Sequence, residues 1–115
     1  MAFRPAQNTH RLLSALNTVN ATLVNARATL VQRINGFNAG AITYLKLYDK
    51  ATAPAETDTP RKTLYIAANT SFDFPFGDGM TFGSGFGYRM TTAAADNSTA
   101  AVAAAAVLAL NIDYS

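Results

Sequence analysis

The sequence predicts an all-β protein, a single antiparallel β-sandwich or jelly roll of six to eight strands with an extended N-terminal arm. Apolar and polar residues alternate along most of the chain after its first dozen residues, and this period places successive side chains on opposite faces of a sheet. Gly, Asn and Pro interrupt the alternation at short intervals, as turns do. A chain of 115 residues fits one domain. We therefore divide it into an arm, residues 1–17, and a sandwich domain, residues 18–115.

The first segment after the extreme N-terminus has a mixed pattern. Residues 12–23 carry apolar side chains at near-helical spacing, but the Asn and Thr residues between them are poor helix formers. We expect an extended arm and then a strand near Thr18–Ala26. A short helix at Arg11–Leu16 is the alternative.

Two alternating segments follow, residues 28–34 and 41–48, and both are predicted strands. In the first, Arg27 and Arg33 share the polar side. The intervening residues 35–40 contain Asn and Gly, which tolerate positive φ, so a turn is expected there.

The second of these strands has two distinct faces. Leu45 and Leu47 lie on one face, and Tyr44, Lys46 and Tyr48 on the other. Aromatic rings alternating with a cation can form a stacking platform for single-stranded nucleic acid or sugar rings. The same arrangement suits an outer sheet face that meets another subunit.

The middle of the chain alternates loops and strands. Residues 51–62 lack periodicity and carry two prolines, which predicts a surface loop, and residues 63–68 resume a strand. A tight turn at residues 69–70 leads into a strand at residues 71–76, whose three phenylalanines share one face and are expected in the core. The proline of this strand places it at an edge or a bulge. A turn is predicted at residues 77–79.

The C-terminal part supplies two further strands. In one, Phe86, Tyr88 and Met90 share a face, and three alternating glycines leave the other face open to close approach by a neighbour. The other is residues 107–114, where apolar residues alternate with Asn111 and Asp113. The Ala-rich segment between them, residues 93–106, is broken by polar residues and is predicted to be a long hairpin loop with at most one helical turn.

The composition argues against catalysis. The chain has no Cys, one His and one Glu, and only 14% of its residues are charged. His10 lies in the predicted arm with no nucleophile motif around it, and Asp73 and Asp78 lack the ligand spacing of a calcium loop. We therefore expect no enzyme activity, no catalytic residues, no cofactor and no metal. The many Ala, Thr and Asn side chains would form a neutral surface that is easily desolvated against other protein.

The charge distribution is uneven although the net charge is only +2. Residues 1–50 hold six basic groups and one acid, whereas residues 51–115 hold three basic groups and six acids. Such asymmetry can orient a protein on a partner or drive contact between copies. The excess is too small to indicate direct contact with nucleic acid. The longest apolar run, Ala100–Leu110, is too short to span a membrane.

Several strings of residues resemble a family of small virion structural proteins of tailed bacteriophages and prophages. They are Ile-Asn-Gly-Phe-Asn-Ala from Ile34, Tyr-Leu-Lys-Leu-Tyr-Asp-Lys-Ala-Thr-Ala-Pro from Tyr44, Thr-Asp-Thr-Pro from Thr57, Phe-Asp-Phe from Phe72, and the ending Leu-Asn-Ile-Asp-Tyr-Ser. The resemblance covers residues 18–115. The Ala-rich segment 100–106 departs from it, since a Gly or acidic turn would be expected there.

This resemblance implies a β-sandwich similar to capsid decoration or cement proteins. It implies a protein located in the virion, assembled in the host cytoplasm, with the major capsid protein and copies of itself as partners, in a homo-oligomer such as a dimer or trimer. A tail, neck or baseplate component is the alternative, and a sugar- or nucleic-acid-binding module is a further one.

We expect the arm to reach onto the capsid or a sister subunit, so that deleting residues 2–12 abolishes binding to the particle. The interface candidates are Phe3, Arg4, Arg11, Arg27, Arg33, Tyr44, Lys46 and Tyr48.

Overall fold

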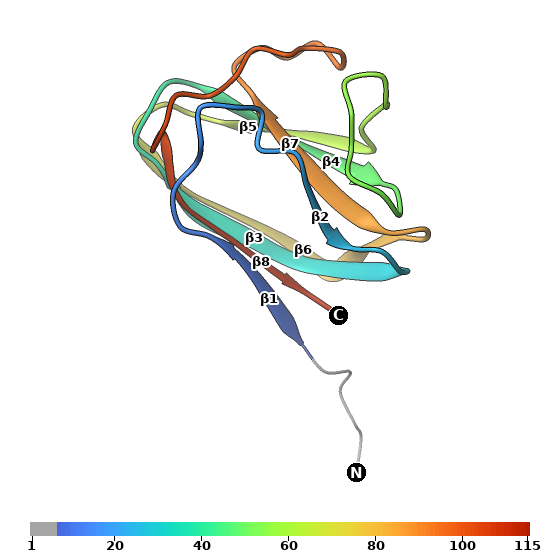
Figure 1. Cartoon of the computed structure of the whole chain (residues 1–115). Helices are drawn as coiled ribbons and strands as arrows, with labels where there is room; N and C mark the ends of the chain where they lie inside the picture. The colour runs from blue at the N-terminus through green and yellow to red at the C-terminus, as the bar shows by residue number, and fades with distance from the viewer. Residues whose placement is uncertain (1–6) are drawn as a thin grey trace.

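The computed structural model describes residues 7–115, which form eight strands and no helix (Figure 1). The strands are β1 (Asn8–Leu12), β2 (Thr22–Asn25), β3 (Thr29–Asn38), β4 (Thr43–Asp49), β5 (Lys62–Ile66), β6 (Thr70–Phe82), β7 (Phe86–Thr91) and β8 (Val107–Tyr114). Within residues 7–115 there is no helix long and apolar enough to cross a membrane.

The strands form two four-stranded antiparallel sheets that pack face to face (Figure 1). Sheet A has the order β1-β8-β3-β6, and sheet B has the order β2-β7-β4-β5. The predicted β-sandwich is thereby confirmed. The strands expected at residues 28–34, 41–48, 63–68, 86–90 and 107–114 correspond to β3, β4, β5, β7 and β8.

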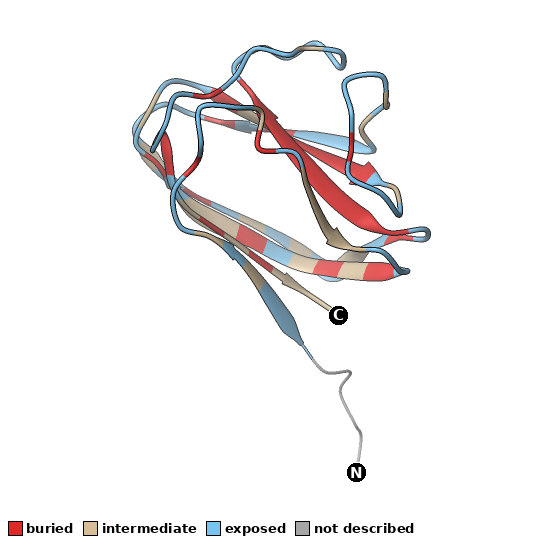
Figure 2. Ribbon diagram, in the orientation of Figure 1, coloured by how far each residue is buried: buried red, intermediate tan, exposed pale blue. Residues whose placement is uncertain are grey.

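The core lies between the two inner sheet faces. Its largest contributions come from β4, β7 and β8, in which most residues of the inner face are buried (Figure 2). The fully buried apolar residues of the central strands include Val31, Ile34, Leu45, Leu47, Phe86, Tyr88, Met90, Val107, Leu110 and Ile112. Burying one such side chain stabilises the fold by about 1.5–3 kcal/mol.

The turn predicted at residues 35–40 is wrong, because β3 continues through it to Asn38. β3 is a central strand that pairs with β6 on one side and β8 on the other. A Cβ atom at Gly36 would lie 1.9 Å from the carbonyl oxygen of Ala109, so the close approach of β8 requires glycine here. Pairing on both sides outweighs the turn preference of Asn and Gly, and the chain reverses at residues 39–42 instead.

The turn predicted at residues 77–79 is also wrong, since it lies inside β6. Gly77 and Gly79 have φ angles of 59° and 110°, which glycine adopts without a steric cost. Pro75 and Met80 pair with positions of β3 that are only two residues apart, so the residues between them bulge out of the ladder. β6 is an edge strand, as the proline of this segment predicts.

The predicted arm, residues 1–17, contains a strand. Residues 8–12 form β1, which pairs with β8 in sheet A, and Leu12 packs against the core. The alternative helix at Arg11–Leu16 is not formed, and β2 lies within the strand predicted near Thr18–Ala26. The Ala-rich residues 93–106 form a loop without a helix, as predicted.

Candidate docking surface

The outer face of sheet B is largely covered by the chain's own loops over β4 and β7. The Lys46 and Arg89 side chains, which face each other across β4 and β7, are 0% and 1% exposed. The Lys46 ammonium donates a hydrogen bond to the carbonyl oxygen of Ala95, and Arg89 Nη2 donates one to the carbonyl oxygen of Ser98 at 2.6 Å. Two buried cations therefore hold the loop at residues 92–100 against the sheet.

A second loop, residues 50–61, covers the part of this face around Gly87. Pro54 is buried against Gly87, where an added Cβ atom would lie 3.0 Å from Pro54 Cδ. Within the loop, Lys50 Nζ lies 2.6 Å from Asp58 Oδ2, and the Ala55 amide donates to the same oxygen at 2.7 Å. The face left bare by glycine is thus occupied by the chain itself.

This covering removes the platform predicted on β4. Tyr48 is buried and accepts a 3.2 Å hydrogen bond from Arg89 Nη1, and Lys46 lies beneath the loop at residues 92–100. Burial, together with the charge of Arg89, lowers the Lys46 pKa. Only Tyr44 stays partly accessible, packed edge-on against Tyr65 with ring centroids 5.7 Å apart.

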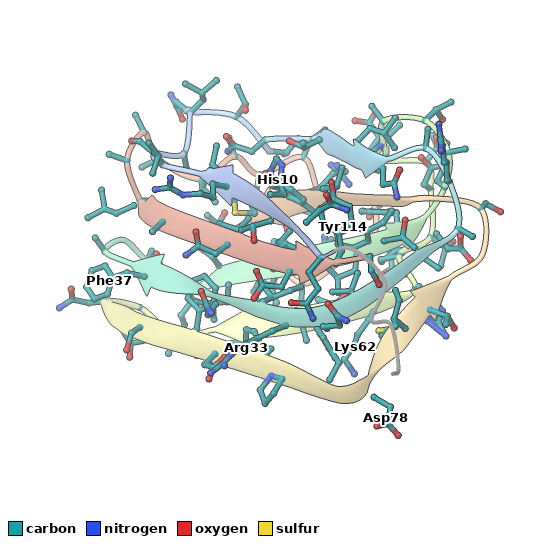
Figure 3. The ribbon with its side chains drawn as sticks, turned by 90° about the horizontal axis from the view of Figure 1, so that it is seen from below. His10, Arg33, Phe37, Lys62, Asp78 and Tyr114 are labelled. Atoms are coloured by element: carbon teal, nitrogen blue, oxygen red, sulfur yellow. The ribbon has the colours of Figure 1, made fainter. Side chains whose placement is uncertain are left out.

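The outer face of sheet A, by contrast, is open. Its side chains stand on alternate positions of the four strands, and all of them are exposed or half-buried (Figure 3). We call this surface the sheet A face; it consists of Thr9, Arg11, Arg33, Asn35, Phe37, Ser71, Asp73, Pro75, Ala109, Asn111 and Asp113.

Several polar groups of the sheet A face are paired with one another. Arg33 donates two hydrogen bonds to Asp73, Nε to Oδ1 at 2.7 Å and Nη2 to Oδ2 at 2.5 Å. These bonds lower the pKa of Asp73 and raise that of Arg33. On the same face, Thr9 Oγ1 of β1 donates a hydrogen bond of 2.9 Å to Asp113 Oδ1 of β8.

The centre of the face is uncharged. Asn111 Nδ2 donates to Asn35 Oδ1 at 3.2 Å between β8 and β3, and Phe37 and Ala109 lie beside each other toward one end. Such a surface needs little desolvation when another protein covers it. Its chemistry suits contact with another protein.

The interface candidates do not form one site. Arg11 and Arg33 both lie on the sheet A face, on strands flanking β8. Arg27 is exposed in the turn between β2 and β3. Phe3 and Arg4 lie outside the described residues.

Only Arg11 and Arg33 of the sheet A face were among the candidates, and the hydrogen-bonded residues Asn35, Asp73, Asn111 and Asp113 were not. The alternation of the last strand places Asn111 and Asp113 on its polar side. Their cross-strand partners depend on the register between strands, which a single sequence does not show.

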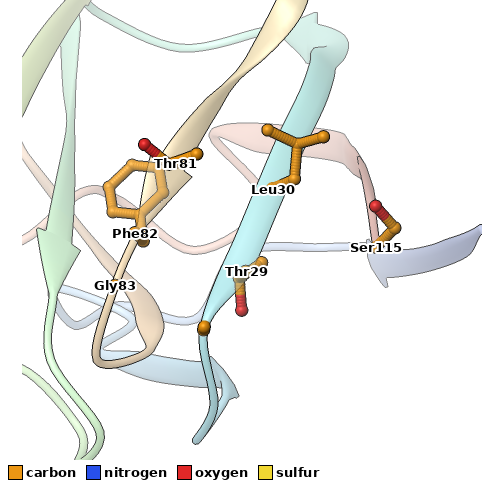
Figure 4. Close-up of a pocket in the computed structure, with 7 residues that line it drawn as sticks. Thr29, Leu30, Thr81, Phe82, Gly83 and Ser115 are labelled. Carbon is orange, nitrogen blue, oxygen red and sulfur yellow. The ribbon is translucent and has the colours of Figure 1, made fainter. Parts of the chain in front are cut away.

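One end of the sandwich has a shallow pocket of about 350 Å³. It is lined by Ala28, Thr29, Leu30, Thr81, Phe82, Gly83 and Ser115, none of which has a titratable side chain (Figure 4). The pocket can accept an apolar group but offers no side chain for acid–base chemistry. No group of three or more His, Asp or Glu side chains that could hold a metal ion occurs among residues 7–115.

The single histidine joins β1 to sheet B. His10 is half-buried on the inner side of β1, its Nε2 lies 3.0 Å from Tyr88 Oη, and the two rings pack edge-on. Burial lowers the pKa of His10 below its ordinary 6.5. Protonation therefore opposes the contact that holds β1 in place.

Acidification is expected to destabilise the fold through His10. Below its ordinary pKa of 6.5 the unfolded chain binds a proton at His10 more readily than the folded chain does, so the free energy of unfolding falls as pH decreases through that value. Urea unfolding between about pH 7 and pH 5 measures this loss. The His10→Gln variant keeps a polar group but does not titrate, and its stability should be nearly flat over that range.

Asp58 and Asp73 affect the stability of the fold in a lower pH range than His10 does. Hydrogen bonds from Lys50 and Arg33 lower the pKa of Asp58 and Asp73, so the stability they contribute is lost only below the ordinary carboxyl pKa of about 3.8. An equal slope above pH 5 in wild type and His10→Gln would contradict the role given to His10.

Comparisons with protein-family models, curated proteins and solved structures found no match to this chain.

Proposed function

We propose that this protein is a non-enzymatic structural component of a bacteriophage virion, a capsid decoration protein that docks on the major capsid protein and stabilises the head by bridging capsomers. The observation that carries the proposal is the sheet A face, an open surface on which Arg33 pairs with Asp73, Thr9 with Asp113 and Asn111 with Asn35. Loops cover β4 and β7 of the other sheet, so the sheet A face is the broader open surface among residues 7–115.

Two further features support the proposal. The strings between Ile34 and the C-terminus resemble small virion structural proteins of tailed phages. A rigid sandwich repeated over a shell adds many modest contacts, whose combined effect resists the pressure of packaged DNA. This assignment implies that the protein is located in the virion.

The position of β1 refines the role of the arm. Asn8 pairs with Tyr114 at the end of β8, so β1 begins at the edge of sheet A. Deleting residues 2–12 would also remove β1 and expose the edge of β8. The arm is therefore better tested by deleting residues 2–6, which leaves β1 intact.

Binding to phage heads tests the proposal. Purified protein should co-sediment with heads of the phage that encodes it, and cryo-electron microscopy should show density over capsomer junctions. The double variant Ser71→Arg and Asn111→Arg adds two bulky charges to the sheet A face and should weaken binding at least about tenfold, equivalent to about 1.4 kcal/mol.

A matched control places the same charges on the other sheet. Thr63 and Tyr65 are exposed on the outer side of β5, so Thr63→Arg with Tyr65→Arg should bind as wild type does. Failure of the wild-type protein to bind heads would overturn the proposal. Equal binding by both double variants would exclude the sheet A face, and density on the tail would favour the tail component instead.

A further inference from the structure

Among the edge strands of the two sheets, β1 has the fewest features that prevent pairing with a further strand. At the other edge of sheet A, β6 contains Pro75 and a glycine bulge, and in sheet B, β2 has only four residues and a register shift. β5 begins at Lys62, directly after Pro60 and Arg61. β1 pairs with β8 over five consecutive residues without proline, glycine or bulge. Proline, bulges, short length and lysine are the means by which edge strands avoid adding a further strand.

The register shows which backbone groups of β1 are free. Ser115 exchanges two backbone hydrogen bonds of 2.9 Å with Leu30 of β3. Successive residues of an antiparallel strand direct their N–H and C=O groups to opposite neighbours. Counting back from Ser115, the residues of β8 that bond to β1 are those opposite Asn8, His10 and Leu12. Thr9 and Arg11 therefore direct their N–H and C=O groups to the open edge.

We propose that β1 pairs antiparallel with β1 of a second copy of this chain, centred on His10. In this register Thr9 lies opposite Arg11 of the second copy, and Arg11 opposite its Thr9. These are the residues whose backbone groups face the edge, so every free N–H between them finds a C=O. Sheet A then continues without interruption from one copy into the other.

Charge complementarity favours a second copy as the occupant. Arg11 is exposed and forms no ion pair with any residue in the described range 7–115. In the dimer it lies across from Thr9 of the second copy, whose hydroxyl donates to Asp113 on the adjoining strand. Two strand spacings, about 10 Å between backbones, separate Arg11 from that Asp113, a span that their two side chains can bridge from the same face.

The pairing has a consequence for docking. A two-fold axis perpendicular to the sheet relates the two copies, so both sheet A faces point to the same side. The dimer would thus present a doubled face to one surface and gain from bivalent attachment. Only this consequence rests on the proposed function, because the dimer itself can be measured without capsids.

Sedimentation equilibrium of the full chain, carried to about millimolar concentration, tests the proposal, since even a Kd near 1 mM is then detectable. Wild type should form a dimer, and hydrogen exchange should show protection of the Thr9 and Arg11 amides that increases with concentration. Thr9→Pro removes an edge-facing N–H from each copy and should weaken dimerisation at least about tenfold. Thr9→Val loses the hydroxyl but keeps the N–H, and it should still dimerise.

Two measurements make the outcome decisive. Urea unfolding should show that Thr9→Pro is as stable as Thr9→Val, because both changes remove the hydroxyl that bonds to Asp113 and neither touches the backbone hydrogen bonds between β1 and β8. Arg11→Glu should weaken the dimer, and adding Asp113→Arg should restore it. A wild-type monomer at every concentration, or unchanged dimerisation of Thr9→Pro, would overturn the proposal, whereas loss of head binding by a dimeric protein would count against docking alone.

Discussion

The Gly36→Ala variant is expected to lose about 4 kcal/mol or more of folding free energy, enough to unfold much of the protein. The new Cβ atom would lie 1.9 Å from the carbonyl oxygen of Ala109 and 2.8 Å from Phe72 Cζ. Gly36 lies in a central strand that is paired on both sides, so neither neighbour can move away without breaking a ladder. Circular dichroism during urea unfolding measures the loss.

Gly83→Ala is the matched control for this variant. A Cβ atom at Gly83 would meet nothing within 4 Å, and Gly83 does not have a positive φ angle. Its unfolding midpoint should stay close to that of wild type, with a change within about 0.5 kcal/mol. If Gly36→Ala unfolded at the same urea concentration as Gly83→Ala, the close strand packing described at β3 would be incorrect.

Tyr88→Ala is expected to cost about 3–5 kcal/mol, the range for removing a large buried ring. Tyr88 is 0% exposed in β7 and pairs with Leu47 and Thr22 on either side. Its ring centroid lies 5.5 Å from that of His10, so the same side chain links sheet B to β1. The variant should therefore lose global stability and, in hydrogen exchange, protection of the β1 amides.

Tyr88→Phe separates the contribution of the ring to stability from that of the hydroxyl. It keeps the buried ring and loses the hydroxyl that bonds to His10 Nε2, a hydrogen bond that contributes about 1 kcal/mol. The Phe variant should lie much closer to wild type than the Ala variant does. Equal destabilisation by the two changes would show that the hydroxyl, and not packing, holds the sheets together at this point.

Strand alternation was a reliable guide where a strand is buried on its inner side along its whole length. The patterns around Leu45, Tyr88 and Leu110 correctly indicate which residues enter the core. Turn-prone residues were a poor guide within sheets. Gly36 and Gly77 stand inside strands, one because a neighbouring strand approaches closely and the other because the strand bulges.

The candidate site was predictable only in part. The alternation of polar residues in the sequence is the same for an outer face exposed to solvent and for one covered by loops of the same chain. Lys46 and Tyr48 therefore resemble an exposed platform in sequence, although loop carbonyls and Arg89 enclose them. Arg33 was identified from its charge, but its partner Asp73 lies 40 residues away and is found only through the β3–β6 register.

The sequence by itself determined the all-β class, the inner face of most strands and the scarcity of catalytic groups, because these follow from local periodicity and composition. The tertiary structure alone decided which outer face is open, which glycines are enclosed by neighbouring strands, and that residues 8–12 form an edge strand. These properties depend on contacts between segments far apart in the chain, which local preferences do not encode.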